Sequence, residues 1–251
     1  MNKFVNKSFT KRLSALFLAF ALTFSLGACS ANNSTKSLVS ESDTSMTDSS
    51  QTLSETEETS AIESKKTANT LVVYFSMPET TNPNNMTQEE DNSVVVINGE
   101  VLGNTQYVAY VIQENTGADI FRIEPETPYP TDHETLVDLA KEEQNQNARP
   151  KLKASIENFE QYDTVFIGYP NWWGDMPMIL YSFFDEYDFS GKTIIPFNTH
   201  GGSGFSNTIN TITKLEPAAT VNPNGFTVSR NSVQEAEPDI LSWLKEIGYA
   251  Q

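Results

Sequence analysis

Residues 71–76 read LVVYFS, a continuous apolar run of β-branched and aromatic side chains that ends in a serine. A strand that is buried on both faces of a sheet shows such a run, whereas a half-exposed strand alternates. Similar runs are DTVFIGYP at 163–170 and KTIIPFNTH at 192–200, and weaker ones lie at 118–125 and 219–228. The sequence therefore predicts five strands, three from strong patterns and two from weaker ones.

Helical patterns lie between the expected strands. One runs from 104 to 117, with a capping-type Asn104 at its start and Gly117 at its end. The other expected helices occupy residues 132–147, 176–188, 205–215 and 235–248. Strands that alternate with helices indicate βαβ units, and five of each in about 180 residues match an open, doubly wound α/β domain with a parallel sheet of order 2-1-3-4-5.

The N-terminal segment predicts export. Residues 1–12 carry four positive and no negative side chains, and the fourteen residues that follow are uncharged. This order is typical of a secretory signal, and the apolar run is shorter than the roughly 20 residues of a membrane span. LGAC at 26–29 resembles the lipobox of bacterial lipoproteins, in which the signal is removed before the cysteine and the thiol receives a lipid. We expect a signal peptide over 1–28 and a lipidated Cys29, which would anchor the protein at the extracytoplasmic face of the cell membrane; the alternative is an ordinary signal peptide with a chance cysteine.

Residues 29–68 are interpreted as a tether. From 30 to 67, 18 of the 38 residues are serine or threonine. Such a segment holds too little apolar surface to offset the entropy lost when a chain becomes ordered, so it is expected to be disordered. The folded domain is expected over 69–251.

The charge of the folded segment excludes some partners. The whole chain has a formal charge of −17, and residues 69–251 alone hold 26 acidic and 9 basic side chains. Such an acidic domain argues against nucleic acid as a partner and against a basic membrane-binding face, because phosphate groups attract lysine and arginine. The single cysteine excludes an intramolecular disulfide, and the sequence holds no metal-ligand spacing, nucleophile elbow or G-x-G-x-x-G motif.

The expected topology indicates where a ligand would bind. In an open α/β sheet, ligands bind beyond the carboxyl ends of the strands, at the point where the strand order reverses. For the order 2-1-3-4-5 this point lies between the first and third strands. The candidate loops are therefore those that follow 71–76, 163–170 and 192–200.

Two of these loops have an unusual composition. YPNWWGDMP at 169–177 places Trp172 beside Trp173, and THGGSG at 199–204 holds three glycines in four positions. Tryptophan offers the largest flat face for stacking a planar ring, and glycine lets the backbone approach a ligand closely. His200 could hydrogen-bond either a ring carbonyl or a substrate. Taken separately, the tryptophans could pack a helix and the glycines form a tight turn; together at the switch point they favour a planar-ring ligand.

Five motifs resemble those of the flavodoxin-like family of FMN-binding proteins, including its secreted lipoprotein branch. They are YFS at 74–76, GNT at 103–105, PYP at 128–130, GYPNWWGDMPM at 168–178 and FNTHGGSG at 197–204. The resemblance covers nearly the whole domain, and the last two motifs are fairly specific. It implies a flavodoxin-like, doubly wound, parallel five-stranded sheet. It also implies FMN as the cofactor, with the phosphate at the first loop and the isoalloxazine ring between the other two.

The first loop departs from the family pattern. The family's strand runs directly into a phosphate loop of the type S-x-T-G-N-T, whereas here SM at 76–77 and GNT at 103–105 are separated by an insert, residues 78–102. The insert contains SVVVINGEVLG, whose alternation around Asn98-Gly99 predicts a β-hairpin. The insert could also serve as a lid or a docking element.

A phosphate site survives the insert in principle. The hydroxyls of Ser76 and Thr105, with the N–H groups at the start of the 104–117 helix, would hold a dianion. Four carboxylates precede the hairpin in the insert, and any of them close to the phosphate would repel it. These carboxylates are Glu79, Glu89, Glu90 and Asp91.

The resemblance implies roles for individual residues. The residues expected to contact FMN are Ser76, Met77, Asn104, Thr105, Pro170, Asn171, Trp172, Trp173, Gly174, Thr199, His200, Gly201, Gly202, Ser203 and Gly204. Trp172 or Trp173 would stack on the ring. If the protein reduces a quinone or another small acceptor, His200 or Tyr169 would donate the proton. His133 is interpreted as a surface residue.

The expected function is electron transfer or flavin-dependent reduction by a lipid-anchored protein, with a redox partner protein or a small molecule as acceptor. The acidic domain disfavours the anionic flavin hydroquinone and so lowers its potential, which suits an electron carrier. Two alternatives stay open. One is a flavin-free lipoprotein that binds a small ligand or partner, favoured by the insert and its carboxylates. The other is a tethered interaction domain whose aromatic patch docks another protein.

Overall fold

The computed structural model describes residues 69–249. The expected signal peptide, the lipidation site Cys29 and the tether lie outside the described residues. Between residues 69 and 249, none of the helices combines the length and the apolar character that crossing a membrane requires.

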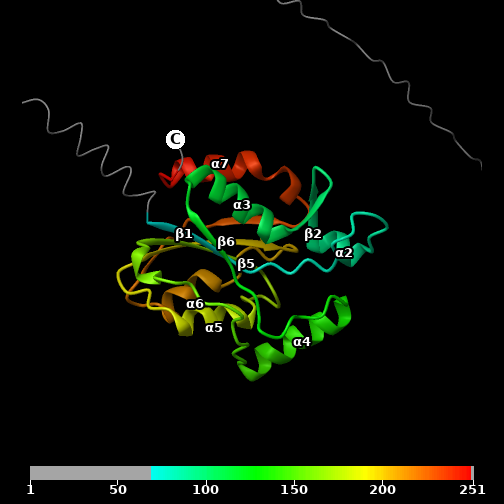
Figure 1. The fold of residues 1–251 in the computed structure, drawn as a ribbon, viewed down its shortest axis with the longest axis horizontal. Helices are drawn as coiled ribbons and strands as arrows, with labels where there is room; N and C mark the ends of the chain where they lie inside the picture. Colours follow the sequence, from blue (N-terminus) through cyan, green and yellow to red (C-terminus); the bar gives the residue numbers. More distant parts are fainter. Residues whose placement is uncertain (1–68, 250–251) are drawn as a thin grey trace, which may run out of the picture. The chain divides into compact units, whose positions relative to one another are not determined.

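A parallel sheet forms the centre of the domain (Figure 1). Its strands are β1 (Thr70–Tyr74), β4 (Asp119–Arg122), β5 (Thr164–Pro170), β6 (Thr193–His200), β7 (Thr220–Val221) and β8 (Phe226–Ser229). They follow the order β4-β1-β5-β6-β7, with β8 also paired to β6, and each of these pairings is parallel. The predicted α/β class and flavodoxin-like order 2-1-3-4-5 are confirmed.

The fifth expected strand differs from the prediction, because it is divided into β7 and β8. Pro223 lies between the two pieces, and proline has no N–H to donate to a strand ladder. Gly225 passes so close to β6 that a Cβ atom there would lie 2.5 Å from the carbonyl oxygen of Pro196. The chain therefore pairs with β6 in β7, separates from it, and pairs with it again in β8. The second pairing lies nearer the carboxyl end of β6.

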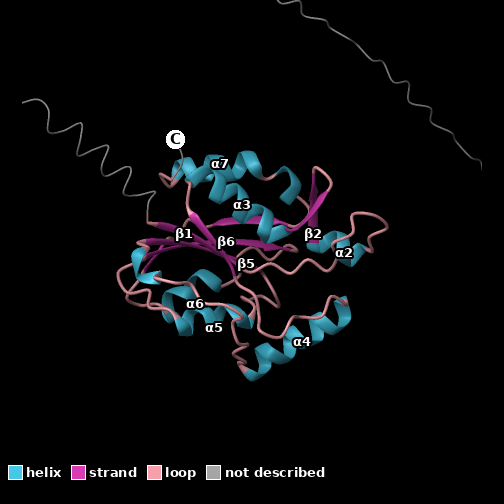
Figure 2. Ribbon diagram, viewed as in Figure 1, coloured by secondary structure: helices cyan, strands magenta, loops and turns pink. Residues whose placement is uncertain are grey.

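Helices cover both faces of the sheet (Figure 2). They are α3 (Asn104–Thr116), α4 (His133–Gln146), α5 (Met178–Glu186), α6 (Thr208–Leu215) and α7 (Glu237–Glu246), with short 3₁₀ helices η1 (Phe159–Gln161) and η2 (Val233–Glu235). α3 and α7 lie on one face, whereas α5 and α6 lie on the other, with α4 on the same side as α5. All five expected helices are present. Asn104 is the first helical residue rather than the cap, which is Gly103.

Each face of the sheet carries its own hydrophobic core. Val73 of β1 and Ile167 of β5 belong to the core under α5, whereas their neighbours Val72 and Phe166 belong to the core under α3 and α7. Successive side chains of a strand point to opposite faces. The continuous apolar runs therefore supply side chains to both cores, with alternate residues on the two faces of the sheet.

The insert after β1 folds back onto the domain as a short helix and a hairpin. α2 (Gln88–Ser93) is followed by β2 (Val94–Ile97) and β3 (Glu100–Gly103), which pair antiparallel. Asn98 and Gly99 have φ angles of 52° and 87°, as a two-residue type I′ turn requires. The predicted hairpin is therefore confirmed.

The sequence analysis missed helix α2, although the sequence contains a signal for it. Thr87 and Glu90 form a capping box, in which the Thr87 hydroxyl accepts from the Glu90 N–H and the Glu90 carboxylate accepts from the Thr87 N–H. The T-x-x-E spacing is the known signature of such a helix start. The helix has six residues and none of them is buried, so the sequence shows no apolar periodicity from which a helix could be predicted.

Candidate functional site

A cavity of about 320 Å³ opens at the carboxyl ends of β1, β5 and β6. Eleven of the expected contact residues line it: Ser76, Met77, Asn104, Thr105, Pro170, Asn171, Trp172, Trp173, Thr199, His200 and Gly201. The lining leaves out Tyr169, Gly174, Gly202, Ser203 and Gly204. The three loops chosen from the topology therefore do converge on one cavity.

One end of the cavity is built from the end of β1 and the start of α3. Ser76 and Thr105 are both buried, and a Cβ atom on Gly103 would lie 2.2 Å from the Ser76 Oγ atom. The hydroxyls of Thr105 and Thr199 are 2.8 Å apart, which connects α3 to β6. The first N–H groups of α3 have no partner within the helix and are available to an anion.

Asn104 holds an unsatisfied polar atom in this end of the cavity. Its Nδ2 donates to the carbonyl oxygen of Asn92 at 2.8 Å, which fixes the orientation of the amide. Its Oδ1 is buried without a hydrogen-bond partner among the described residues. A buried acceptor without a partner costs about 1–3 kcal/mol, so this atom suits a ligand that brings a hydroxyl or N–H donor.

The turn that carries the two tryptophans holds its residues in an unusual backbone conformation. Trp172 and Asp175 exchange backbone hydrogen bonds of 2.9 and 3.0 Å, so Trp173 and Gly174 form a two-residue turn. Their φ angles are 53° and 80°. A glycine accepts a positive φ without strain, but a tryptophan does not, and the cost is about 1–2 kcal/mol.

The two tryptophans have different surroundings. Trp172 packs edge-on against Phe75 and Tyr129, with ring centroids 5.5 and 5.7 Å away. Trp173 is 53% exposed, and its indole N–H donates to the Val137 carbonyl oxygen of α4 at 3.1 Å. Lys141 lies over the Trp173 ring at 5.3 Å. Trp172 is therefore tied to the core, whereas Trp173 is a strained and largely exposed side chain at the edge of the cavity.

The glycine loop orients His200. The Gly202 N–H donates to His200 Nδ1 at 2.8 Å, so in the neutral ring the hydrogen lies on Nε2. Partial burial lowers the pKa of His200 below its usual value, which favours the neutral form. Gly204 has a structural role, because its carbonyl oxygen accepts from the side-chain amides of Asn171 and Asn198 at 3.0 and 2.9 Å.

Tyr169 does not reach the cavity. Its side chain is fully buried, and its hydroxyl donates to Thr208 Oγ1 at 2.7 Å. Burial also raises the pKa of Tyr169. The structure therefore gives no support to Tyr169 as a proton donor to a bound substrate, because its side chain faces the core under α5 instead.

Arg230 lies in the cavity wall without having been expected there. It follows β8, and its backbone N–H donates to the His200 carbonyl oxygen at 2.8 Å. Its guanidinium would be 3.4 Å from a Cβ atom placed on Gly201, so the absent side chain leaves room for it. No ion pair involves Arg230 in residues 69–249. The position of Arg230 could have been predicted, because this residue follows the end of the last expected strand, which pairs with β6.

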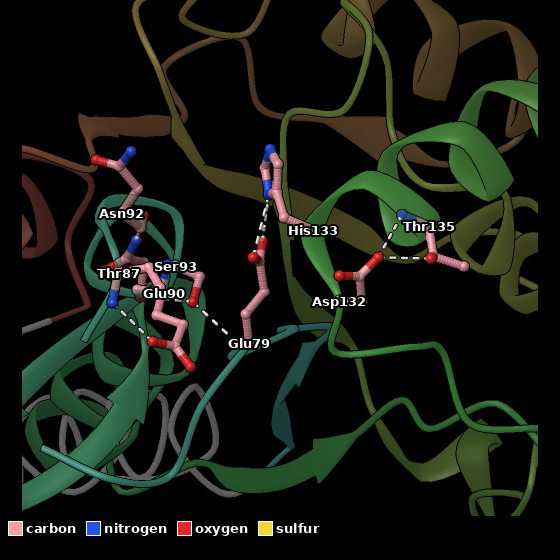
Figure 3. A network of polar contacts seen from close by, with 9 residues as sticks. Glu79, Thr87, Glu90, Asn92, Ser93, Asp132, His133 and Thr135 are labelled. Atoms are coloured by element: carbon pink, nitrogen blue, oxygen red, sulfur yellow. Dashed lines mark hydrogen bonds and ion pairs between the residues drawn. The ribbon is translucent and has the colours of Figure 1, made fainter. Parts of the chain in front are cut away.

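The insert and α4 supply the remaining walls. They contribute Glu79, Glu89, Asn92, Ser93, His133, Leu136, Val137 and Ala140. Of the four carboxylates that precede the hairpin in the insert, Glu79 and Glu89 line the cavity and Glu90 caps α2. His133 is exposed, as expected, and its Nδ1 lies 3.0 and 3.1 Å from the two carboxylate oxygens of Glu79 (Figure 3).

The fold and this cavity define a class of protein: a doubly wound α/β domain with a ligand cavity at its switch point. The chain belongs to the flavodoxin family, whose sequence model matches residues 93–247. No curated protein sequence matches the chain.

Solved structures of bacterial proteins are similar to this domain. One is a candidate flavoprotein from Bacteroides eggerthii, with 29% identity, a TM-score of 0.54, and coverage of 71% of this chain and 97% of that one. Another is a candidate flavoprotein from Bacteroides uniformis, with 26% identity, a TM-score of 0.50, and coverage of 66% and 96%. A flavoprotein from Lactobacillus acidophilus, solved in complex with FMN, has 16% identity, a TM-score of 0.47, and coverage of 66% and 97%.

Proposed function

We propose that this protein binds FMN in the cavity and uses it for electron transfer or for the reduction of an acceptor. The observation that carries the proposal is Trp173, a bulky residue held at a positive φ with about half of its surface exposed at a switch-point cavity. Strain of this kind persists at sites where a function requires it. A flat flavin ring is a ligand that such a side chain would stack on.

The other parts of FMN also find partners among the cavity residues. The N–H groups at the start of α3 and the Ser76 hydroxyl suit the phosphate. The unpartnered Oδ1 of Asn104 suits a hydroxyl of the ribityl chain. His200 would donate a hydrogen bond from Nε2 to the ring edge, since its lowered pKa keeps it neutral near pH 7.

The bound cofactor would supply the hydride or electron chemistry, and the protein would position the ring and set its potential. The acidic domain disfavours added negative charge on the ring, whereas Arg230 favours it. The acceptor would be a redox partner protein or a small molecule. His200 stays a candidate catalytic residue, as a hydrogen-bond donor.

FMN binding can be tested with the full-length protein by titration of FMN and of riboflavin, which lacks the phosphate. We expect FMN to quench tryptophan fluorescence, because two of the three tryptophans line the cavity. Riboflavin should bind at least about tenfold more weakly, since the α3 N-terminus would lose its anion.

The carboxylates of Glu79 and Glu89 favour a second candidate, a flavin-free protein that binds another small ligand. In that case neither flavin would quench the fluorescence or acquire a protein-induced change in absorbance. Equal affinity for FMN and riboflavin would instead contradict the phosphate site at α3.

We also propose that Cys29 carries a lipid that holds the domain at the extracytoplasmic face of the cell membrane. The support is the sequence alone, with LGAC at 26–29 after an apolar run. In a bacterial host, Cys29→Ser should move the protein from the membrane fraction to the soluble fraction, whereas Ser30→Ala should leave it with the membrane. Membrane recovery of the Cys29→Ser protein would refute the anchor.

A further inference from the structure

Glu79 and His133 form a carboxylate–imidazole pair in the cavity wall. Glu79 comes from the insert, and His133 is the first residue of α4. The His133 Nδ1 atom lies 3.0 Å from one carboxylate oxygen and 3.1 Å from the other. Figure 3 shows the second ring nitrogen pointing away from Glu79. Because the carboxylate can only accept, Nδ1 carries a hydrogen and Nε2 is left for a ligand.

Both partners are anchored independently of each other. The Glu79 N–H donates to Ser93 Oγ at 2.9 Å, and the Ser93 hydroxyl donates to the Glu90 carbonyl oxygen at 2.8 Å. On the other side, the Asp132 carboxylate caps α4 by accepting from the Thr135 N–H at 3.0 Å. The Glu79 side chain is only 8% exposed, whereas that of His133 is 44% exposed. The carboxylate is therefore a fixed support, and the imidazole is the part open to a ligand.

The charges around the imidazole are mostly negative. Glu79 and Glu89 face the cavity from the insert, and Asp132 precedes His133 at the start of α4. The other charged or titratable residues of the cavity lining are His200 and Arg230, and Glu134 lies on the outer side of α4. A buried carboxylate on Nδ1 balances the positive charge of a protonated ring, as in catalytic triads.

Helix α4 presents one stripe of side chains to the cavity. His133, Leu136, Val137 and Ala140 follow the spacing i, i+3, i+4, i+7, and all four line the cavity. The stripe is apolar except for the imidazole at its N-terminal end. The indole N–H of Trp173 donates a hydrogen bond to the backbone carbonyl oxygen of Val137, a residue of this stripe. This wall matches a flat, apolar molecule with an oxygen at one end, which is the chemistry of a quinone.

We propose that Glu79 and His133 are a proton-donating pair for the two-electron reduction of a quinone-type acceptor; this rests on the proposed FMN function. Reduction of a quinone to a hydroquinone takes two electrons and two protons. A hydride from the reduced flavin brings the electron pair and one hydrogen to one quinone oxygen. The second proton leaves His133 Nε2 for the other oxygen. The bound flavin would be oxidised and the quinone reduced, and the neutral ring would take up a proton from solvent while its Nδ1–H still donates to Glu79.

The test compares two acceptors in single-turnover reactions of the full-length protein. The FMN-loaded protein is reduced with dithionite without oxygen and mixed either with 1,4-benzoquinone or with ferricyanide, and flavin reoxidation is followed by absorbance. Ferricyanide takes one electron and no proton. His133→Gln should slow the quinone reaction about 100-fold, the usual scale for loss of a general acid, and should change the ferricyanide reaction less than about twofold.

A pH series separates a proton donor from a packing residue. The wild-type quinone rate should fall as the pH rises, because the step consumes a proton, and this dependence should be absent in His133→Gln. The Kd for FMN should stay within about threefold of the wild-type value, because the flavin contacts are unchanged. Glu79→Gln should also slow the quinone reaction selectively. Glu134→Gln, which removes a neighbouring carboxylate outside the cavity, should not.

Ring nitrogen NMR of the FMN-free protein gives a readout without turnover. The neutral His133 ring should carry its hydrogen on Nδ1, and Glu79→Ala should move it to Nε2. Equal slowing with both acceptors, or an unchanged quinone rate in His133→Gln, would overturn the proton-donor role while leaving FMN binding intact. A wild-type protein that binds no FMN would instead overturn the proposed function and, with it, this one.

Discussion

Trp173→Asn is expected to weaken FMN binding about 30-fold while the free energy of unfolding of the flavin-free protein stays within about 1 kcal/mol of the wild-type value. Stacking of a flat heterocycle on an aromatic side chain contributes ~2 kcal/mol, which corresponds to this change in Kd. Asparagine tolerates a positive φ, so the strain of about 1–2 kcal/mol at this position is relieved. That gain offsets the lost contacts to Val137 and Lys141. Flavin titration and urea unfolding give the two quantities.

The adjacent tryptophan is the matched control for stability. Trp172→Ala removes a ring that packs on Phe75 and Tyr129, and should lower the free energy of unfolding by about 3 kcal/mol. If Trp173→Asn instead lost as much stability as Trp172→Ala and bound FMN normally, Trp173 would be a packing residue. That result would contradict a flavin stacked on Trp173.

Gly168→Ala is expected to lower the free energy of unfolding by about 3 kcal/mol or more. Gly168 lies in β5 opposite Phe197 of β6, and a Cβ atom there would lie 2.1, 2.2 and 2.8 Å from three atoms of the Phe197 ring. The ring is fully buried in the core under α3 and α7, where it packs over Gly168. Urea unfolding measures the loss.

A double variant tests the cause of this loss. Phe197→Leu alone leaves a cavity and destabilises the core, but with Gly168→Ala it makes room for the new methyl group. The two changes together should cost clearly less than the sum of the single changes. Gly201→Ala is the control, because a Cβ atom there has ordinary contacts at 3.4 Å and should hardly change stability. Additive losses would show that the overlap with Phe197 is not the reason.

Much of the fold could be predicted from sequence because the strands are buried on both faces. Runs such as 71–76 have no polar alternation, which is typical of a strand in a sheet that is covered on both faces. The hairpin followed from Asn98-Gly99, since few other pairs adopt two successive positive φ angles. The division of the last strand escaped prediction because Pro223 and Gly225 were read inside a continuous pattern, although Pro223 has no N–H to donate to a strand ladder.

Only those parts of the candidate site that follow from the strand order could be predicted from the sequence. The strand order identified the loops that meet at the cavity. It does not predict that helix α4 and the insert cover these loops. Helix α4 is polar in sequence, and its inward stripe depends on where the preceding loop places His133. Tyr169 was assigned to the ligand from its place near a strand end, but the alternation of β5 puts it on the same face as Ile167, in the core under α5.

The two ends of the insert meet, and this has an evolutionary consequence. Ser76 lies against Gly103 so closely that a Cβ atom there would overlap its hydroxyl, and Pro78 is only 3.3 Å from the same point. A loop whose two ends lie close together can vary in length without displacing the strand before it or the helix after it. Each doubling of the loop's length lowers the folding stability by only about 0.6 kcal/mol, through the entropy of loop closure. The segment between 78 and 102 is therefore an exchangeable module. Under the proposed function, a change of this segment would alter the wall formed by Glu79 and Glu89 while Ser76 and Thr105, which lie outside the segment, stay in place.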